Sequence, residues 1–238
     1  MSQTIVFIPG LVSDQRAWSA VAQNLAELGY ATGIADLTGA GSITAMARAV
    51  LAQFPGDLLP VGHSMGGRVA MEVARLAPER VTGLVLVATG AHPLADGERA
   101  NRERVIRLAN SQGMQALCDQ WLPPMLAPET QLHNPALYQS LQQMVLDAGA
   151  QVHERQVRAL ISRPDARPLL GSLSVPTLFV AGEFDGWSSP LQHQQMASLV
   201  AQAEVAVVQG VGHFLQVEAP KKFSQILAQW LERKGFTE

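Results

Sequence analysis

The stretch that decides the fold is residues 58–76, LLPVGHSMGGRVAMEVARL. It begins as an apolar run typical of a buried strand and ends with apolar residues at helical spacing. Between the two lies GHSMG, residues 62–66, so Ser64 stands where a strand must turn into a helix. Such a turn holds a hydroxyl clear of the backbone, at a helix N-terminus where developing negative charge is favoured. Side chains two residues either side of the serine would collide, which accounts for Gly62 and Gly66.

The G-x-S-x-G pattern has two interpretations. In one it is a glycine-lined packing turn with a capping serine, and in the other the serine is a nucleophile on a sharp turn. The pattern alone is weak, since roughly one chain of this length in ten would contain it by chance. The strand-like run before it and the helical pattern after it favour the nucleophile.

Apolar runs rich in β-branched residues alternate with helix-period segments, which predicts an α/β fold with a mostly parallel sheet covered by helices. The six predicted strands are residues 5–8, 30–35, 58–61, 84–87, 177–180 and 205–208. Between residues 92 and 168 the alternation breaks, and only helical patterns remain. These patterns are residues 102–109, 114–121, 137–147 and 151–160. We therefore predict a core of residues 1–91 and 169–238, with an all-helical insertion of residues 92–168 after the fourth strand.

Composition disfavours several classes of partner. The 238 residues are 47% hydrophobic, and the formal net charge of −3 gives no electrostatic reason to expect nucleic acid or a membrane as partner. The single cysteine, Cys118, suits a reducing compartment, and no apolar run approaches the roughly 20 residues of a membrane span. With no signal-peptide pattern, the sequence predicts a cytoplasmic protein. Nucleotide-binding motifs and metal-ligand spacings are missing from the sequence, so no cofactor and no metal is predicted.

An acid and a histidine follow Ser64 in the order that such a serine nucleophile requires. Glu183 and Asp185 follow the fifth predicted strand, and His213 follows the sixth. Because the carboxyl ends of parallel strands meet at one edge of a sheet, we expect these side chains to reach the serine. His213 would take the serine proton, while the acid orients the imidazole and stabilises its charged form. Asp185 is the favoured acid, Glu183 is the alternative, and His63 is expected to pack beneath the turn.

The chain resembles the α/β-hydrolase superfamily over essentially its full length. The resemblance rests on PGL (residues 9–11) after the first strand, DLTGAGS (residues 36–42) after the second, the serine turn, and the acid and histidine loops. The insertion is similar to the helical cap of that family. The resemblance implies an oxyanion hole made by the backbone N–H groups of Leu11 and Met65. Many relatives have histidine where this chain has Pro9, so the loop that carries Leu11 lacks that support.

The start of the chain departs from the family pattern. Relatives usually place an antiparallel hairpin before the strand that leads to Pro9, whereas only four residues precede Ile5. We predict that this hairpin is missing, which leaves six parallel strands and puts residues 30–35 at an edge of the sheet. Because proteins normally shorten, charge or cover an exposed edge, we expect a loop or a partner subunit of a homo-oligomer to cover it.

The candidates for substrate contacts near the predicted site are Arg68, Trp121, Trp187 and Phe214. Arg68 lies one helical turn after Ser64, where it is either a solvated charge or the contact of a substrate carboxylate. The second interpretation draws on SMGGR, residues 64–68, which resembles the turn of the pyruvate-eliminating synthases of menaquinone biosynthesis. The apolar residues of the insertion, Trp121 among them, either form its own core or roof an apolar pocket.

The predicted function is cleavage of a small-molecule carboxylic ester by a serine hydrolase through an acyl-enzyme intermediate. One alternative on the same fold is a C–C bond hydrolase or a pyruvate-eliminating lyase, with His213 as base and a carboxylate-bearing substrate near Arg68. A non-catalytic ligand-binding relative is a further alternative, because a fold does not determine a function. The intact set of serine, acid and histidine disfavours it.

Overall fold

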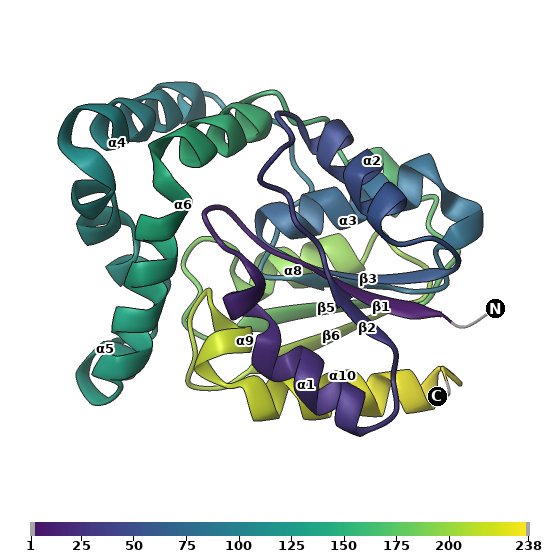
Figure 1. The fold of residues 1–238 in the computed structure, drawn as a ribbon. Helices are drawn as coiled ribbons and strands as arrows, with labels where there is room; N and C mark the ends of the chain where they lie inside the picture. The colour runs from purple at the N-terminus through teal and green to yellow at the C-terminus, as the bar shows by residue number, and fades with distance from the viewer. Residues whose placement is uncertain (1–2, 237–238) are drawn as a thin grey trace.

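The computed structural model describes residues 3–236, and its strands form one parallel sheet (Figure 1). The strands are β1 (Thr4–Ile8), β2 (Thr32–Ile34), β3 (Leu58–His63), β4 (Leu84–Val87), β5 (Thr177–Gly182) and β6 (Ala203–Val208). Their order across the sheet is β2-β1-β3-β4-β5-β6, and every neighbouring pair is parallel. The prediction of six parallel strands is confirmed, and no antiparallel strand joins this sheet within residues 3–236.

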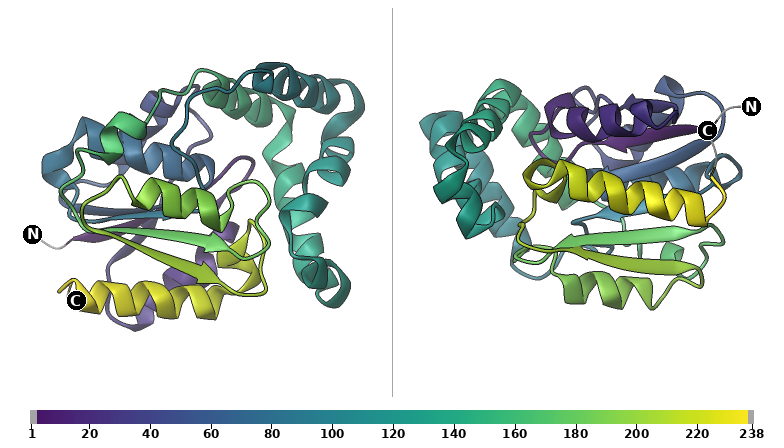
Figure 2. Two further views of the ribbon diagram at one scale, coloured as in Figure 1. Left: turned by 180° about the vertical axis from the view of Figure 1, so that it is seen from behind. Right: turned by 90° about the horizontal axis from the view of Figure 1, so that it is seen from below.

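Helices cover both faces of the sheet. The helices outside the β4–β5 segment are α1 (Ser19–Glu27), α2 (Ile43–Gln53), α3 (Met65–Leu76), α8 (Pro190–Ala197), α9 (Leu215–Glu218) and α10 (Pro220–Arg233), with short 3-10 helices η1 (Gln15–Ala17) and η2 (Pro78–Arg80). Helices α1 and α10 lie on one face, and α2, α3 and α8 lie on the other (Figures 1 and 2). Because both faces are covered, the central strands are apolar throughout instead of alternating with polar residues.

Alternate side chains of strand β1 point to opposite faces of the sheet and pack into two different hydrophobic clusters. Ile5 and Phe7 pack into the cluster beneath α1 and α10, while Val6 and Ile8 pack into the cluster beneath α2 and α3. All four are almost fully buried. This two-sided packing holds the strand that leads directly into the loop with Leu11.

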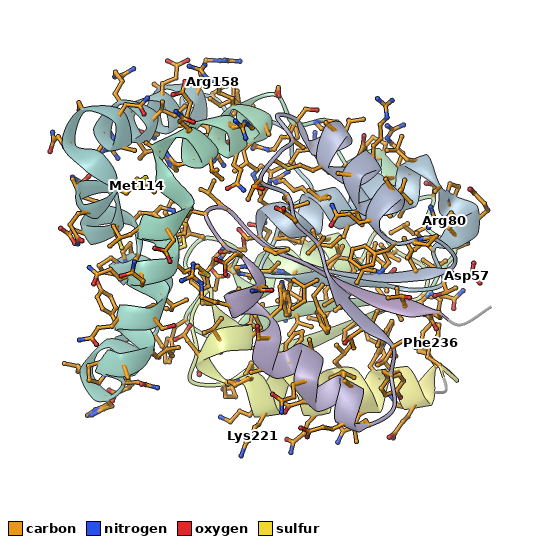
Figure 3. The ribbon with its side chains drawn as sticks, viewed as in Figure 1. Asp57, Arg80, Met114, Arg158, Lys221 and Phe236 are labelled. Carbon is orange, nitrogen blue, oxygen red and sulfur yellow. The ribbon has the colours of Figure 1, made fainter. Side chains whose placement is uncertain are left out.

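The segment between β4 and β5 is helical, and most of it lies beside the sheet edge at which the strands end (Figure 2). This part contains α4 (Glu98–Trp121), η3 (Pro123–Met125), α5 (Pro128–His133) and α6 (Pro135–Ile161), and we call it the cap. The short helix α7 (Arg167–Leu170) follows, and its Leu170 packs into the core cluster beneath α2 and α3. The two long helices are kinked at Gly113, with φ 87°, and at Gly149, with φ 74°. These kinks lie at the predicted breaks between helical patterns, because glycine adopts a positive φ without steric cost. The side chains in Figure 3 fill the space between the cap helices, with Met114 labelled beside the first kink.

Strand β2 occupies one edge of the sheet and is shorter than predicted. The sequence pattern of residues 30–35 yields a strand of only three residues, Thr32–Ile34. A short edge strand offers few unpaired backbone groups to another chain, so the shortness of β2 partly protects this edge from pairing with another chain. The covering partner subunit stays a prediction. None of the helices within residues 3–236 combines the length and the apolar character that crossing a membrane requires.

Candidate active site

The turn between β3 and α3 carries Ser64 with a positive φ of 54° and a ψ of −115°. A non-glycine residue in this region is strained, and such strain persists only where the surroundings impose it. A methyl group added to Gly62 would stand 2.3 Å from the carbonyl oxygen of Gly66, so the two glycines allow the close approach. The predicted reason is confirmed for Gly62, whereas a methyl group added to Gly66 would meet the carbonyl oxygens of Ile8 and Pro9, so Gly66 is required by the close approach of β1.

Three side chains from three loops form one hydrogen-bonded chain. His213 Nε2 lies 3.0 Å from Ser64 Oγ, and His213 Nδ1 lies 2.8 Å from Asp185 Oδ2. Since a carboxylate only accepts hydrogen bonds, we assign the proton to Nδ1, which leaves the Nε2 lone pair to accept from the serine hydroxyl. The structure thus brings together the residues that sequence order alone had grouped.

Asp185 is held in place by more than the imidazole. Its Oδ1 accepts hydrogen bonds from the N–H groups of Trp187, at 2.8 Å, and Ser188, at 2.9 Å. Burial by itself would raise the pKa of Asp185, but the hydrogen bond from His213, the positive charge that this ring carries when it is protonated, and the two backbone donors lower the pKa to about 2. Glu183 is exposed and accepts from the N–H of Gly210 instead, so it does not contact the histidine.

The two residues predicted to supply oxyanion donors both lie at this site. Leu11 and Met65 both line the cavity at Ser64, and Met65 is the first residue of α3. Within the described residues, the N–H groups of Leu11 and Met65 have no hydrogen-bond acceptor. A helix N-terminus adds a favourable potential for negative charge at this position. The pair has the donors that an oxyanion hole needs.

A cavity of about 500 Å³ opens on Ser64 and His213 and lies between the core and the cap. Trp121, Met125, Val157 and Leu160 supply apolar cap surface, so the cap roofs this cavity. Trp187 also lines it and is 56% exposed. No group of three or more His, Cys, Asp or Glu side chains in the described part of the chain is placed to hold a metal ion.

Phe214 does not line this cavity, so its predicted role in substrate contact is wrong. The side chain is 1% exposed, and its ring packs 5.3 Å from the His63 ring and 6.1 Å from the Trp121 ring, measured between centroids. Its position next to His213 in the sequence suggested access to the site. The backbone after the histidine turns the ring into the core instead.

Arg68 lines the cavity as a half-buried cation without a carboxylate partner in the described residues. Its Nη1 donates to the carbonyl oxygen of His92 at 2.8 Å. The Glu98 carboxylate accepts hydrogen bonds from the guanidinium groups of Arg102 and Arg163, so it pairs with those two side chains and not with Arg68. Burial and the charges of Arg163 and Arg102 lower the pKa of Arg68, while the nearby carboxylates of Glu98 and Asp165 act in the opposite direction. A negatively charged group bound in the cavity would stabilise the Arg68 guanidinium.

His63 has a role that sequence reasoning did not find. It packs beneath the turn as expected, and its Nε2 also donates to the carbonyl oxygen of His213 at 2.9 Å. The two imidazole rings lie 4.9 Å apart. Burial lowers the pKa of His63 to about 3, so the ring is neutral near pH 7. Nothing in a lone histidine beside a serine indicates this contact, because its acceptor is 150 residues away.

The buried histidines predict how stability depends on pH. Burial lowers the pKa of His63 to about 3 and that of His153 to about 4, whereas both rings protonate near pH 6.5 when unfolded. Between these values the unfolded chain binds more protons, so the free energy of unfolding falls as pH falls. We expect about 1.4 kcal/mol per pH unit for each ring between roughly pH 6 and pH 4.

Urea titrations at pH 7, 6 and 5 measure this slope. His153→Leu should reduce the slope of the unfolding free energy against pH by the contribution of one ring, about 1.4 kcal/mol per pH unit. His133→Leu is the matched control, because the side chain of His133 is 73% exposed. A slope that is the same in His153→Leu and in the unchanged protein would contradict the prediction.

The six-stranded parallel sheet with helices on both faces, and the strand-to-helix turn that carries Ser64, are features of the α/β-hydrolase class of proteins. The chain belongs to the Alpha/beta hydrolase family, whose model matches residues 5–226. It is 28% identical to a 2-succinyl-6-hydroxy-2,4-cyclohexadiene-1-carboxylate synthase of Salmonella agona (strain SL483), with 96% of this chain and 93% of that protein covered.

Solved structures show the same family resemblance. A thermophilic esterase from Thermogutta terrifontis, solved with malate bound, is 26% identical, with a TM-score of 0.89 and 98% of this chain and 90% of that chain covered. MenH from S. aureus is 22% identical, with a TM-score of 0.85 and 98% and 92% covered, which shows a shared fold. Esterases and synthases are therefore both among the relatives of this chain.

Proposed function

We propose that this chain is a serine hydrolase that cleaves small carboxylic esters through an acyl-enzyme intermediate. The observation that carries the proposal is the chain of hydrogen bonds from Ser64 through His213 to Asp185, at 3.0 Å and 2.8 Å. A serine hydroxyl is a weak nucleophile unless a base within hydrogen-bond distance takes its proton. The cavity that opens on this serine gives a substrate access to it.

Each group has a defined part in the proposed reaction. Ser64 Oγ attacks the ester carbonyl while His213 Nε2 takes its proton, and the N–H groups of Leu11 and Met65 stabilise the oxyanion. The histidine then protonates the leaving alcohol, which breaks the ester bond and leaves the acyl group on the serine. Water, deprotonated by the same nitrogen, then attacks the acyl carbonyl, and the bond to Ser64 Oγ breaks as the histidine returns a proton to that oxygen, which releases the acid. Asp185 stays ionised throughout and stabilises the imidazolium.

Trapping with a fluorophosphonate tests the proposal, because the reagent phosphonylates an activated serine. We expect a stoichiometric adduct on the peptide that contains Ser64, found by mass spectrometry, and turnover of a chromogenic ester series. Labelling and ester turnover would support the hydrolase. The absence of both would support the non-catalytic ligand-binding alternative.

A second function, C–C bond hydrolysis or a pyruvate-eliminating lyase reaction with His213 as base, is favoured by Arg68. The guanidinium lacks a carboxylate partner within residues 3–236 and lines the cavity beside Ser64, as a contact for a substrate carboxylate would. The synthase relative supports this candidate, and the esterase relative supports the first. Fast conversion of a keto acid or dicarboxylate combined with slow ester turnover would favour the second.

Replacing Arg68 distinguishes an anion contact from a solvated charge. We expect Arg68→Met to lower kcat/KM for a monoester of succinic acid by about 10-fold to 100-fold more than for a neutral butyrate ester, because a hydrogen bond to a charged group is lost. Arg48→Met, at an exposed position on α2, is the control. Equal losses on the two esters would contradict a carboxylate contact.

A further inference from the structure

The cap reaches the loop that carries the proposed oxyanion donor. Gln156, on α6, accepts a hydrogen bond at its Oε1 from the N–H of Val12 at 2.8 Å. Both residues are 1% exposed, so water does not compete for this bond. Val12 directly follows Leu11, whose N–H is one of the two proposed oxyanion donors. The contact joins positions that are 144 residues apart.

Val12 is held in a conformation that its side chain disfavours. Its φ is 46°, which is a genuine outlier for a β-branched residue. A residue in this region persists only when its surroundings over-determine the backbone. Here the surroundings are the buried valine side chain, the hydroxyl of Ser13, which donates to the carbonyl oxygen of Leu11 at 3.2 Å, and the amide of Gln156.

These contacts decide the orientation of the peptide between Leu11 and Val12. Without the Gln156 oxygen, the buried N–H of Val12 would have no acceptor, and rotation of this peptide would both expose the N–H to a new partner and relieve the positive φ. That rotation changes ψ of Leu11 together with φ of Val12, and Leu11 is the residue whose N–H is proposed as an oxyanion donor. The strained state is therefore maintained by an acceptor from the cap.

We infer that Gln156 is a positioning residue for the oxyanion hole: it holds the Leu11–Val12 peptide so that the N–H of Leu11 stays available beside Ser64. The inference rests on the proposed function, because it assigns a role within that reaction. The cap then does more than roof the cavity. Its placement on the core completes the site that stabilises the tetrahedral intermediate.

Removal of the acceptor at nearly constant side-chain length tests this role. Gln156→Met should lower kcat by about 10-fold to 100-fold, less than the 10²–10³ of deleting an oxyanion donor outright, with KM changed less than about threefold. Gln156→Glu keeps an acceptor oxygen and should recover most of the rate. Gln151→Met, the same change at an exposed position of the same helix, is the matched control.

A transition-state analogue separates positioning from a merely structural role. A trifluoromethyl ketone forms a tetrahedral adduct with Ser64 whose oxyanion occupies the hole. The inhibition constant of this ketone should be higher for Gln156→Met than for the unchanged protein, by the same factor by which kcat/KM falls. This is the result expected for an interaction made only in the transition state. If the Met variant is insoluble, Gln156→Asn, whose shorter side chain withdraws the acceptor, takes its place.

The outcomes separate this inference from the proposed function. Wild-type rate and inhibition in the acceptor-free variant would overturn the role of Gln156 alone, as would a rate loss without weaker inhibition. A protein that is not labelled at Ser64 and turns over no ester would overturn both. A parallel loss of rate and of inhibitor affinity, rescued by Gln156→Glu, supports the inference.

Discussion

Ser64→Ala is expected to lower kcat for an ester substrate by about 10⁶-fold, because a serine nucleophile and its base act as a unit and removal of either abolishes the covalent pathway. KM should change little, since the cavity walls stay in place. The measurement is steady-state turnover of a chromogenic ester, with active sites of the unchanged protein counted by fluorophosphonate titration and the variant compared at equal protein concentration. Ser198→Ala, at an exposed hydroxyl on the surface, is the matched control.

Residual activity decides how the result is interpreted. An alanine variant that keeps more than a few per cent of the rate would mean that another group attacks the substrate. Fluorophosphonate labelling on a different peptide would lead to the same conclusion. Either result would remove the basis of the acyl-enzyme mechanism, whatever the hydrogen-bond distances.

Gly66→Ala is expected to have the largest effect on stability. The added methyl carbon would lie 2.1 Å from the carbonyl oxygen of Ile8 and 2.6 Å from that of Pro9, and both atoms are backbone. Since neither can move without separating β1 from α3, we expect a loss of at least about 3 kcal/mol, at or beyond the upper end for overpacked cores. For a domain of this size that lowers Tm by roughly 6–12 °C or prevents folding.

Thermal melting followed by circular dichroism measures the effect. Gly39→Ala is the matched control, because a methyl group there meets nothing within 4 Å. Equal melting temperatures for the two variants would show that the turn tolerates a side chain. The explanation of the glycine pattern given above would then be wrong.

Much of the fold follows from local pattern. The apolar runs of β1, β3, β4 and β5 are long enough to be buried on both faces, and that property marks parallel strands in any sequence. Edge elements were less clear: residues 30–35 read as a full strand, but only three of them pair. An edge strand pairs with one neighbour, so its length depends on how far that neighbour extends alongside it. The local sequence pattern of the edge strand does not contain this information.

The site divides in the same way. Ser64, Asp185 and His213 could be named because strand order determines which loops meet at one edge of the sheet. Phe214 was misassigned and Gln156 was missed. For both, the deciding fact is the direction in which a side chain points once distant segments have packed.

By itself, the sequence determined the α/β class, the strained turn at the serine and the identity of the three polar residues, because these depend on spacing along the chain. Only the tertiary structure decided that an amide from the cap holds the loop of Leu11, that His63 donates to the carbonyl oxygen of His213, and that Arg68 lacks a carboxylate partner within the described residues. Hydrogen bonds between residues more than a hundred positions apart require both backbones to be placed first. A sequence pattern shows which hydrogen-bonding groups are present but not how far apart they lie in the folded protein.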